Sequence, residues 1–165
     1  MTTPTATPQP ARPLPAGPSA RLAVAAAAAW GLLFAAVHVY WLFGGRALLP
    51  DGLSVTGNLP LLVIDVLAVP LSLAATALAL ALIRPWGLRF GKLPRTAGWA
   101  VAAVLAVHAL PTVPDWLLLA AGRQELAGMP AMERFATALY EPWFLLGAVL
   151  FAAAVHTTGR GRRRG

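Results

Sequence analysis

The chain contains no cysteine among its 165 residues. This absence excludes structural disulfides, thiolate metal sites and dithiol redox chemistry within the sequence. Lysine occurs only once, at Lys92, and Asp and Glu together number only 6. Charged residues make up 12% of the chain and hydrophobic residues 58%, with a mean hydropathy of +0.68. Such a composition argues against a soluble globular protein and favours one small membrane domain.

Several sequence motifs of enzymes are also missing. The chain has no Gly-rich phosphate loop, no His-Glu-x-x-His zinc motif and no Gly-x-Ser-x-Gly nucleophile elbow. We therefore expect neither a metal nor a cofactor. The formal net charge is +7, but the basic residues flank apolar stretches and no basic folded domain accompanies them. Nucleic acid is therefore not an expected partner.

Four long apolar segments dominate the rest of the sequence. Each has about 22 to 25 residues, which is enough for a helix to cross a hydrocarbon core of ~30 Å. They occupy residues 22–43, 59–83, 97–120 and 135–156. The sequence therefore predicts an all-α bundle of four transmembrane helices over residues 21–156. It also predicts a disordered Pro/Thr/Ala-rich tail over residues 1–20 and a basic tail over residues 157–165.

Arginine and lysine are distributed unevenly between the two sides of this predicted bundle. Ten of the 13 lie in the termini or in the segment 84–95, and only Arg46, Arg123 and Arg134 lie in or at the edge of the other two loops. The positive-inside rule therefore predicts that both termini are cytoplasmic. The basic tail is expected to contact anionic membrane lipids. Frequent Ala and Arg beside a single Lys are typical of a GC-rich bacterial gene, so we expect a multi-pass protein of the bacterial cytoplasmic membrane.

Each predicted span carries ionisable residues, namely His38, Asp65, His108, Asp115 and Glu141. An ionised group at the bilayer centre costs on the order of 3 kcal/mol or more, so such residues turn inward, form pairs and often mark a site. A helical rise of about 1.5 Å per residue places three of them, His38, Asp65 and Glu141, about 9–10 Å below the outer surface. The same estimate puts Asp115 at a shallower depth and His108 near the middle. We therefore expect His38, Asp65 and Glu141 to converge in one polar layer in the outer half of the bundle.

Helical spacing places further polar or small residues beside these groups. The stripes are Asp65 with Ser72 and Thr76, His108 with Thr112 and Asp115, Arg134 with Thr137 and Glu141, and Gly31 with His38 and Gly45. A glycine in such a stripe lets two helices approach closely. Prolines within spans free backbone carbonyls and bend a helix around a cavity; they are Pro70, Pro111, Pro114 and Pro142.

These residues support three hypotheses about function. The leading one is a pocket that binds a lipid-like or cationic amphiphilic ligand, with aromatic walls and carboxylates that hold a cation. Its candidate binding residues are His38, Tyr40, Trp41, Asp65, His108, Asp115, Tyr140, Glu141 and Trp143. The second is an acid/base isomerase of an isoprenoid or sterol-like substrate, with Asp65 or Glu141 as the acid. The third is a structural subunit in which polar groups only join helices; homo-oligomerisation stays open in all three.

Two stretches resemble an uncharacterised bacterial family of small four-helix membrane proteins, numbered 3995 among domains of unknown function. They are 37-VHVYWLFGG-45 and 135-FATALYEPWFLLGAVLF-151. Members show a His-x-x-Trp element followed by Gly in helix one, and a Tyr-x-Pro-like element in helix four. The matching positions are His38, Trp41, Gly44, Tyr140 and Pro142. The resemblance covers residues 20–156 and implies a four-helix membrane fold without an assigned activity.

A more distant likeness is to the emopamil-binding-protein family of sterol isomerases and related receptors. These are also four-helix bundles with acidic residues and His around a lipid-accessible cavity. Asp65, His108 and Tyr140, each followed by a proline, are similar in placement. The isomerases carry His and Glu one turn apart on helix two, however, whereas Leu61 and Val69 flank Asp65. The resemblance therefore implies a ligand cavity more strongly than isomerase chemistry.

Overall fold

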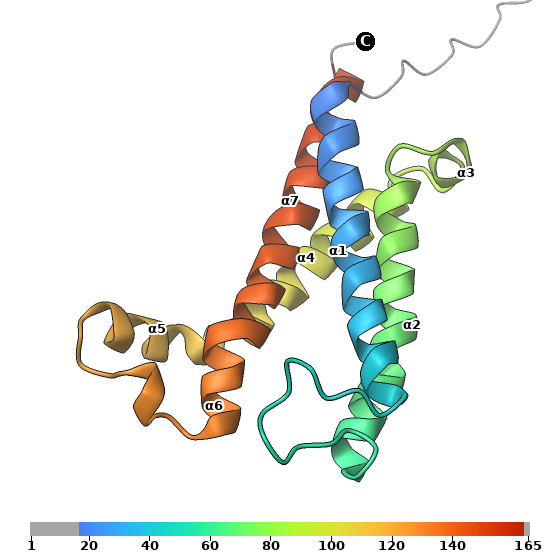
Figure 1. Ribbon diagram of the computed structural model, residues 1–165. Helices are drawn as coiled ribbons and strands as arrows, with labels where there is room; N and C mark the ends of the chain where they lie inside the picture. Colours follow the sequence, from blue (N-terminus) through green and yellow to red (C-terminus); the bar gives the residue numbers. More distant parts are fainter. Residues whose placement is uncertain (1–16, 164–165) are drawn as a thin grey trace, which may run out of the picture.

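The computed structural model describes residues 17–163, and this part of the chain is helical without any strand (Figure 1). The α-helices are α1 (Pro18–Leu42), α2 (Leu59–Ala81), α3 (Pro85–Leu88), α4 (Leu93–Ala109), α5 (Val113–Ala120), α6 (Ala131–Phe135) and α7 (Glu141–Arg163). Short 3₁₀ turns occupy Leu110–Thr112 and Leu126–Gly128, and a π-helical turn occupies Ala136–Tyr140. Among the described residues, four helical stretches are long and apolar enough to cross a membrane: Pro18–Leu42, Leu59–Ala81, Leu93–Ala120 and Ala131–Gly159. The predicted four-helix fold is confirmed.

The two predicted tails overlap with helices at their inner ends. Most of the predicted disordered tail, residues 1–16, lies outside the described residues, but α1 already begins at Pro18. Proline suits this first helical position because its missing N–H would have no helical partner there. At the other end, the backbone of the predicted basic tail continues α7 as far as Arg163. Glycines in that stretch weaken a helix by only ~1 kcal/mol each, which does not end it.

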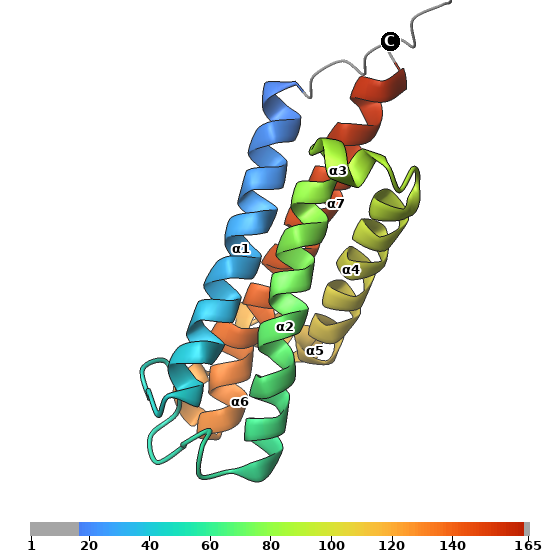
Figure 2. The same cartoon turned by 90° about the vertical axis from the view of Figure 1, so that its right-hand side faces the viewer.

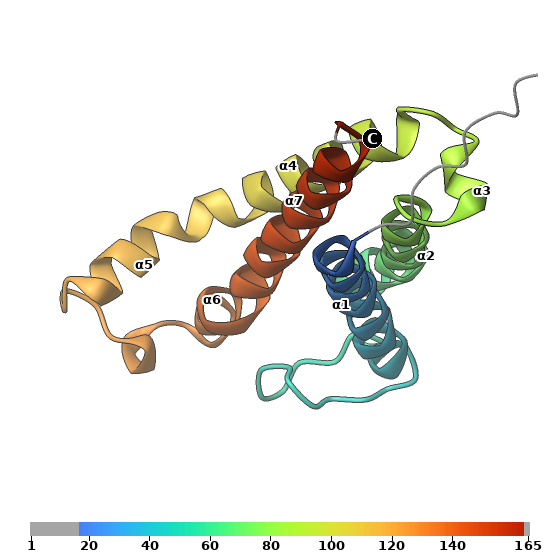
Figure 3. The ribbon, with the colours of Figure 1, turned by 90° about the horizontal axis from the view of Figure 1, so that it is seen from above.

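The helices form two hairpins that share one interface. α1 packs along α2, α4 packs along α7, and α1 packs against α7. Figure 2 shows these four helices running beside one another, and the view from above in Figure 3 shows the two pairs. The start of α1, the end of α7 and α3 lie at one end of the bundle, and the loop after α1 lies at the other (Figure 1).

The side chains also fit a membrane environment. A buried core joins α1, α4 and α7 and includes Val24, Trp30, Phe34, Leu105 and Phe151. Many large apolar side chains are instead exposed on the outer faces of the helices, among them Leu22, Leu33, Leu67, Leu71, Val104, Val107 and Val149. A water-soluble monomer rarely exposes so much apolar surface. These faces are suited to contact lipid.

The α1–α2 interface is formed by small and polar residues. Asp65, Ser72 and Thr76 are all buried, as their stripe predicted. The Thr76 hydroxyl donates to the Ser72 carbonyl at 3.0 Å and lies 3.4 Å from the Ala28 carbonyl. A Cβ atom on Gly31 would meet the Thr76 hydroxyl and would lie 3.0 Å from the Ser72 carbonyl oxygen. The glycine therefore lets the two backbones approach closely, as expected.

Two prolines change the path of the other hairpin. α4 ends at Ala109, and the 3₁₀ turn Leu110–Thr112 contains Pro111. Because proline lacks an N–H and clashes with the carbonyl four residues earlier, the helix bends here, and α5 leaves the bundle (Figures 1 and 3). Pro142 likewise offers no N–H to the carbonyl of Ala138, and the wider π-helical turn Ala136–Tyr140 directly precedes Glu141.

Candidate functional site

The first of two histidine–carboxylate pairs joins α1 to α2. His38 Nε2 lies 3.8 Å from Asp65 Oδ1, and both side chains are buried. The other ring nitrogen, Nδ1, donates to the Phe34 carbonyl at 2.9 Å, because a carbonyl can only accept. Phe34 and Trp41 hold the ring from two sides, with centroids 4.3 and 5.1 Å away. The imidazole is thereby fixed with Nε2 toward α2 and the π-helical turn.

The second pair joins α4 to α7. His108 Nδ1 lies 3.0 Å from Glu141 Oε2, a short hydrogen bond in which the ring nitrogen donates to the carboxylate. The side chain of Glu141 is 11% exposed and that of His108 is 47% exposed. The His108 ring stacks on Phe144 with centroids 3.9 Å apart. This arrangement leaves Nε2 of His108 available to another group.

Tyr140 lies between the two pairs. Its hydroxyl is 3.4 Å from His38 Nε2, and its ring centroid is 6.4 Å from that of His108. The Trp116 indole N–H donates to the Thr137 carbonyl at 2.9 Å and thereby ties α5 to the π-helical turn that carries Tyr140. Residues from all four spans therefore contribute to one polar layer.

The pairing within this layer differs in part from the expectation. His38 and Asp65 face each other as expected, but Glu141 bonds to His108 and makes no hydrogen bond or ion pair with His38 or Asp65. The depth estimate that put His108 near the middle of the bundle, apart from Glu141, is wrong. Its cause is the bend at Pro111, which ends the straight part of the third span just after His108.

A cavity of about 510 Å³ lies beside the polar layer. α2 and α4 line its two sides, while α1, α7 and the π-helical turn form its floor. Its lining residues are Trp30, Phe34, Ile64, Leu67, Ala68, Leu71, Ser72, Ala75, Ala100, Val101, Val104, Leu105, His108, Tyr140 and Phe144. The lining is apolar and aromatic apart from Ser72, His108, Tyr140 and the Trp30 indole N–H, which donates to the Trp143 carbonyl at 2.9 Å. The cavity extends from the polar layer to the middle of α1.

Seven of the nine candidate site residues do not line this cavity. Three of them, His38, Asp65 and Glu141, belong to the polar layer beside it, and the other four lie elsewhere. Exposed Tyr40 and buried Trp41 both fasten the loop after α1: the Tyr40 hydroxyl accepts from the Ala47 N–H at 3.4 Å, and the Trp41 indole donates to the Ala47 carbonyl at 2.9 Å. Trp143 stacks behind Trp30, with centroids 6.1 Å apart. Asp115 lies on α5, which leaves the bundle, and has no hydrogen bond or ion pair with the two histidine–carboxylate pairs.

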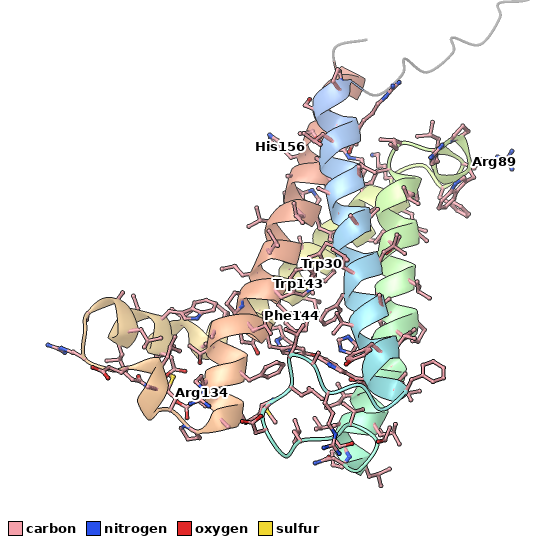
Figure 4. All side chains as sticks on the ribbon, viewed as in Figure 1. Trp30, Arg89, Arg134, Trp143, Phe144 and His156 are labelled. Atoms are coloured by element: carbon pink, nitrogen blue, oxygen red, sulfur yellow. The ribbon has the colours of Figure 1, made fainter. Side chains whose placement is uncertain are left out.

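The aromatic wall is therefore formed mostly by residues that the sequence reasoning missed. Of the aromatic candidates only Tyr140 lines the cavity, and the other aromatic lining residues are Trp30, Phe34 and Phe144. Figure 4 shows Trp30 and Phe144 between α1 and α7. A signal existed, because Trp30 and Phe34 recur at intervals of four residues before His38, and Phe144 follows Tyr140 by the same interval. Such spacing puts each set on one helical face.

The positions of the histidine and acidic residues also bear on metal binding. Within the described part of the chain they form no group of three or more that could hold a metal ion.

Comparisons with known proteins place the chain in a family without assigning a function. No curated protein and no solved structure matches it, so the distant likeness to the emopamil-binding-protein family is not supported. A family model described as "Protein of unknown function (DUF3995)" matches residues 31–151. This match covers more than half of the chain, including both histidine–carboxylate pairs and Tyr140. The chain belongs to this family.

Proposed function

We propose that this chain is a multi-pass protein of a bacterial cytoplasmic membrane whose cavity binds a cationic amphiphile from the lipid phase. The observation that carries the proposal is the position of the His108–Glu141 pair, with His108 at the end of an apolar, aromatic-walled cavity. Pockets for small molecules commonly combine an apolar lining with a few convergent polar groups.

The polar end of the cavity suits an ammonium group. Since His108 Nδ1 donates to Glu141, neutral His108 presents Nε2 as an acceptor for a ligand N–H. The Glu141 carboxylate, which is bonded to Nδ1 of the His108 ring, stabilises the positive charge of the ligand. Charges interact more strongly in a low-dielectric site than in water. Phe34 and Tyr140, which line the cavity beside the polar layer, add cation–π attraction.

The rest of the cavity suits an alkyl chain. Ile64, Leu67 and Leu71 line it from α2, and Val101 and Val104 line it from α4. Its volume of about 510 Å³ lies in the range of roughly 300–1,000 Å³ that is usual for ligand pockets. The alkyl chain of a ligand that enters from the lipid between α2 and α4 stays in an apolar medium throughout. Transfer of the alkyl chain into the cavity therefore costs little free energy of desolvation.

Blocking the cavity tests this proposal. Ala100 and Ala103 are both exposed on α4, but only Ala100 lines the cavity. We expect dodecylamine to raise the melting temperature of the purified wild-type protein saturably and Ala100→Phe to remove this response. The matched control Ala103→Phe should respond like the wild type. Equal responses in both variants, or none in the wild type, would contradict a ligand cavity here.

The topology within the membrane is a separate part of the proposal. Both described chain ends lie at one end of the bundle (Figure 1), and the excess of Arg and Lys there supports a cytoplasmic location. In intact cells, single cysteines at Ser54 and Gln124 should react with an impermeant thiol reagent, while one at Thr96 should not. No native cysteine interferes. Labelling only of the cysteine at position 96 would show the opposite orientation, with both chain ends outside.

A specific observation also favours the isomerase as a second candidate. A histidine that is oriented by a carboxylate and lines a cavity has the usual arrangement of a general base. An acid/base isomerase that moves a double bond adds a proton to one carbon and removes a proton from another, so hydrogen from solvent enters the product. Incorporation of deuterium from D₂O into farnesol in the presence of the protein would therefore separate catalysis from binding alone.

A further inference from the structure

His38, Asp65 and Tyr140 form a polar cluster beside the cavity, and His38 and Asp65 have no role in the ligand binding proposed above. His38 is completely buried and does not line the cavity, but it contacts two residues that do, Phe34 and Tyr140. The Phe34 carbonyl accepts from Nδ1 at 2.9 Å, so Nε2 of the neutral ring is a hydrogen-bond acceptor. Asp65 Oδ1, at 3.8 Å, is beyond hydrogen-bond distance of Nε2. Among the described residues, the Tyr140 hydroxyl at 3.4 Å is therefore the one hydrogen-bond partner of Nε2.

With a neutral His38 ring, this geometry sets the direction of the hydrogen bond of the Tyr140 hydroxyl. A hydroxyl has one hydrogen to donate and two lone pairs with which to accept. If its hydrogen is directed to His38, the Tyr140 oxygen can offer only lone pairs to the cavity. The aromatic contacts of Phe34 and Trp41 prevent the imidazole from turning away from this arrangement.

We propose that His38 is a positioning residue that makes Tyr140 a hydrogen-bond acceptor, so that the cavity selects ammonium groups that keep N–H donors over quaternary ammonium groups. This inference rests on the proposed function and narrows its ligand class to long-chain amines. His108 Nε2 and the Tyr140 oxygen then form two acceptors at the polar end of the cavity. A primary ammonium donates to both, whereas a trimethylammonium group donates to neither.

Two probes that differ only at nitrogen test the inference. Dissociation constants of dodecylamine and dodecyltrimethylammonium are measured from dose-dependent melting temperatures in the same detergent. We expect wild-type protein to prefer dodecylamine, and Tyr140→Phe or His38→Leu to weaken dodecylamine binding about tenfold, as for one hydrogen bond to a charged group. Binding of the quaternary probe should stay unchanged in both variants. His38→Gln should restore the preference, because its amide can donate to Phe34 and accept from Tyr140.

The outcomes separate this inference from the proposal on which it rests. If wild-type protein binds neither probe in a manner sensitive to Ala100→Phe, the cavity proposal fails and this inference fails with it. If both probes bind equally well, the cavity stands and the selection by Tyr140 is refuted. A parallel loss of affinity for both probes in His38→Leu and Tyr140→Phe would show a merely structural role and would overturn the inference. Should His38→Leu fail to fold, Tyr140→Phe, which keeps the ring, still decides.

Discussion

Substitution of Gly31 by valine is expected to lower the stability of the bundle more than any other single change considered. A Cβ atom at this position meets the Thr76 hydroxyl and lies 3.0 Å from the Ser72 carbonyl oxygen and 3.4 Å from the Thr76 backbone nitrogen. Two of these atoms belong to the α2 backbone, so a side-chain rotation does not relieve the contact. Overpacking of this kind costs about 1–3 kcal/mol, and here it separates the helices of the first hairpin.

The direction in which Gly31→Ala shifts the melting temperature makes this test decisive. Alanine is favoured over glycine in a helix by about 1 kcal/mol, so Gly31→Ala would raise the melting temperature if only helix propensity mattered. We expect it to lower the melting temperature in detergent, and Gly31→Val to lower it further. Ala29→Val, at an exposed neighbouring position of α1, is the control for a β-branched residue. A glycine variant as stable as this control would contradict the close α1–α2 contact.

Sequence alone predicted the parts of the fold that depend on one helix at a time. The length and hydropathy of an apolar segment are enough to locate a span, and residues 17–163 contain four such helices. The spacing of Asp65, Ser72 and Thr76 likewise predicted one buried face of α2. Both inferences use only the geometry of a single helix, which the sequence determines almost completely.

The partners of the polar groups could not be predicted in the same way. Periodicity shows which residues share a face but not which helix covers that face. Pro111 indicates that α4 is interrupted, but not that the following segment leaves the bundle and brings His108 level with Glu141. The π-helical turn before Glu141 also changes the direction of the side chains that follow it. The polar layer was therefore predictable, whereas its pairing depended on tertiary structure.

The two histidine–carboxylate pairs have matching positions in their hairpins but differ in burial. Each hairpin has a histidine near the end of its first straight helix and an acid near the start of the returning span: His38 with Asp65, and His108 with Glu141. In the first pair His38 is completely buried. In the second, the half-exposed histidine lines the cavity. The first pair is thus placed to position Tyr140, and the second to meet a ligand.

Glu141→Gln is expected to abolish most of the ligand response while leaving the fold intact. The glutamine carbonyl can still accept the hydrogen bond from His108 Nδ1, so the melting temperature without ligand should stay close to that of the wild type. The negative charge that stabilises a bound ammonium is lost, however. Since interactions with charged partners contribute about 1.5–3 kcal/mol, dodecylamine should bind roughly 10- to 100-fold more weakly.

The matched control for this charge is Glu133→Gln, because Glu133 lies exposed on α6 just before the π-helical turn. Both variants remove one carboxylate from the same span, so they have the same effect on net charge. Melting temperatures with increasing dodecylamine should therefore separate them, with only Glu141→Gln losing the shift. If both keep the wild-type shift, the Glu141 carboxylate does not hold the cation. The His108–Glu141 pair would then serve only to join α4 to α7, as polar pairs between membrane helices commonly do.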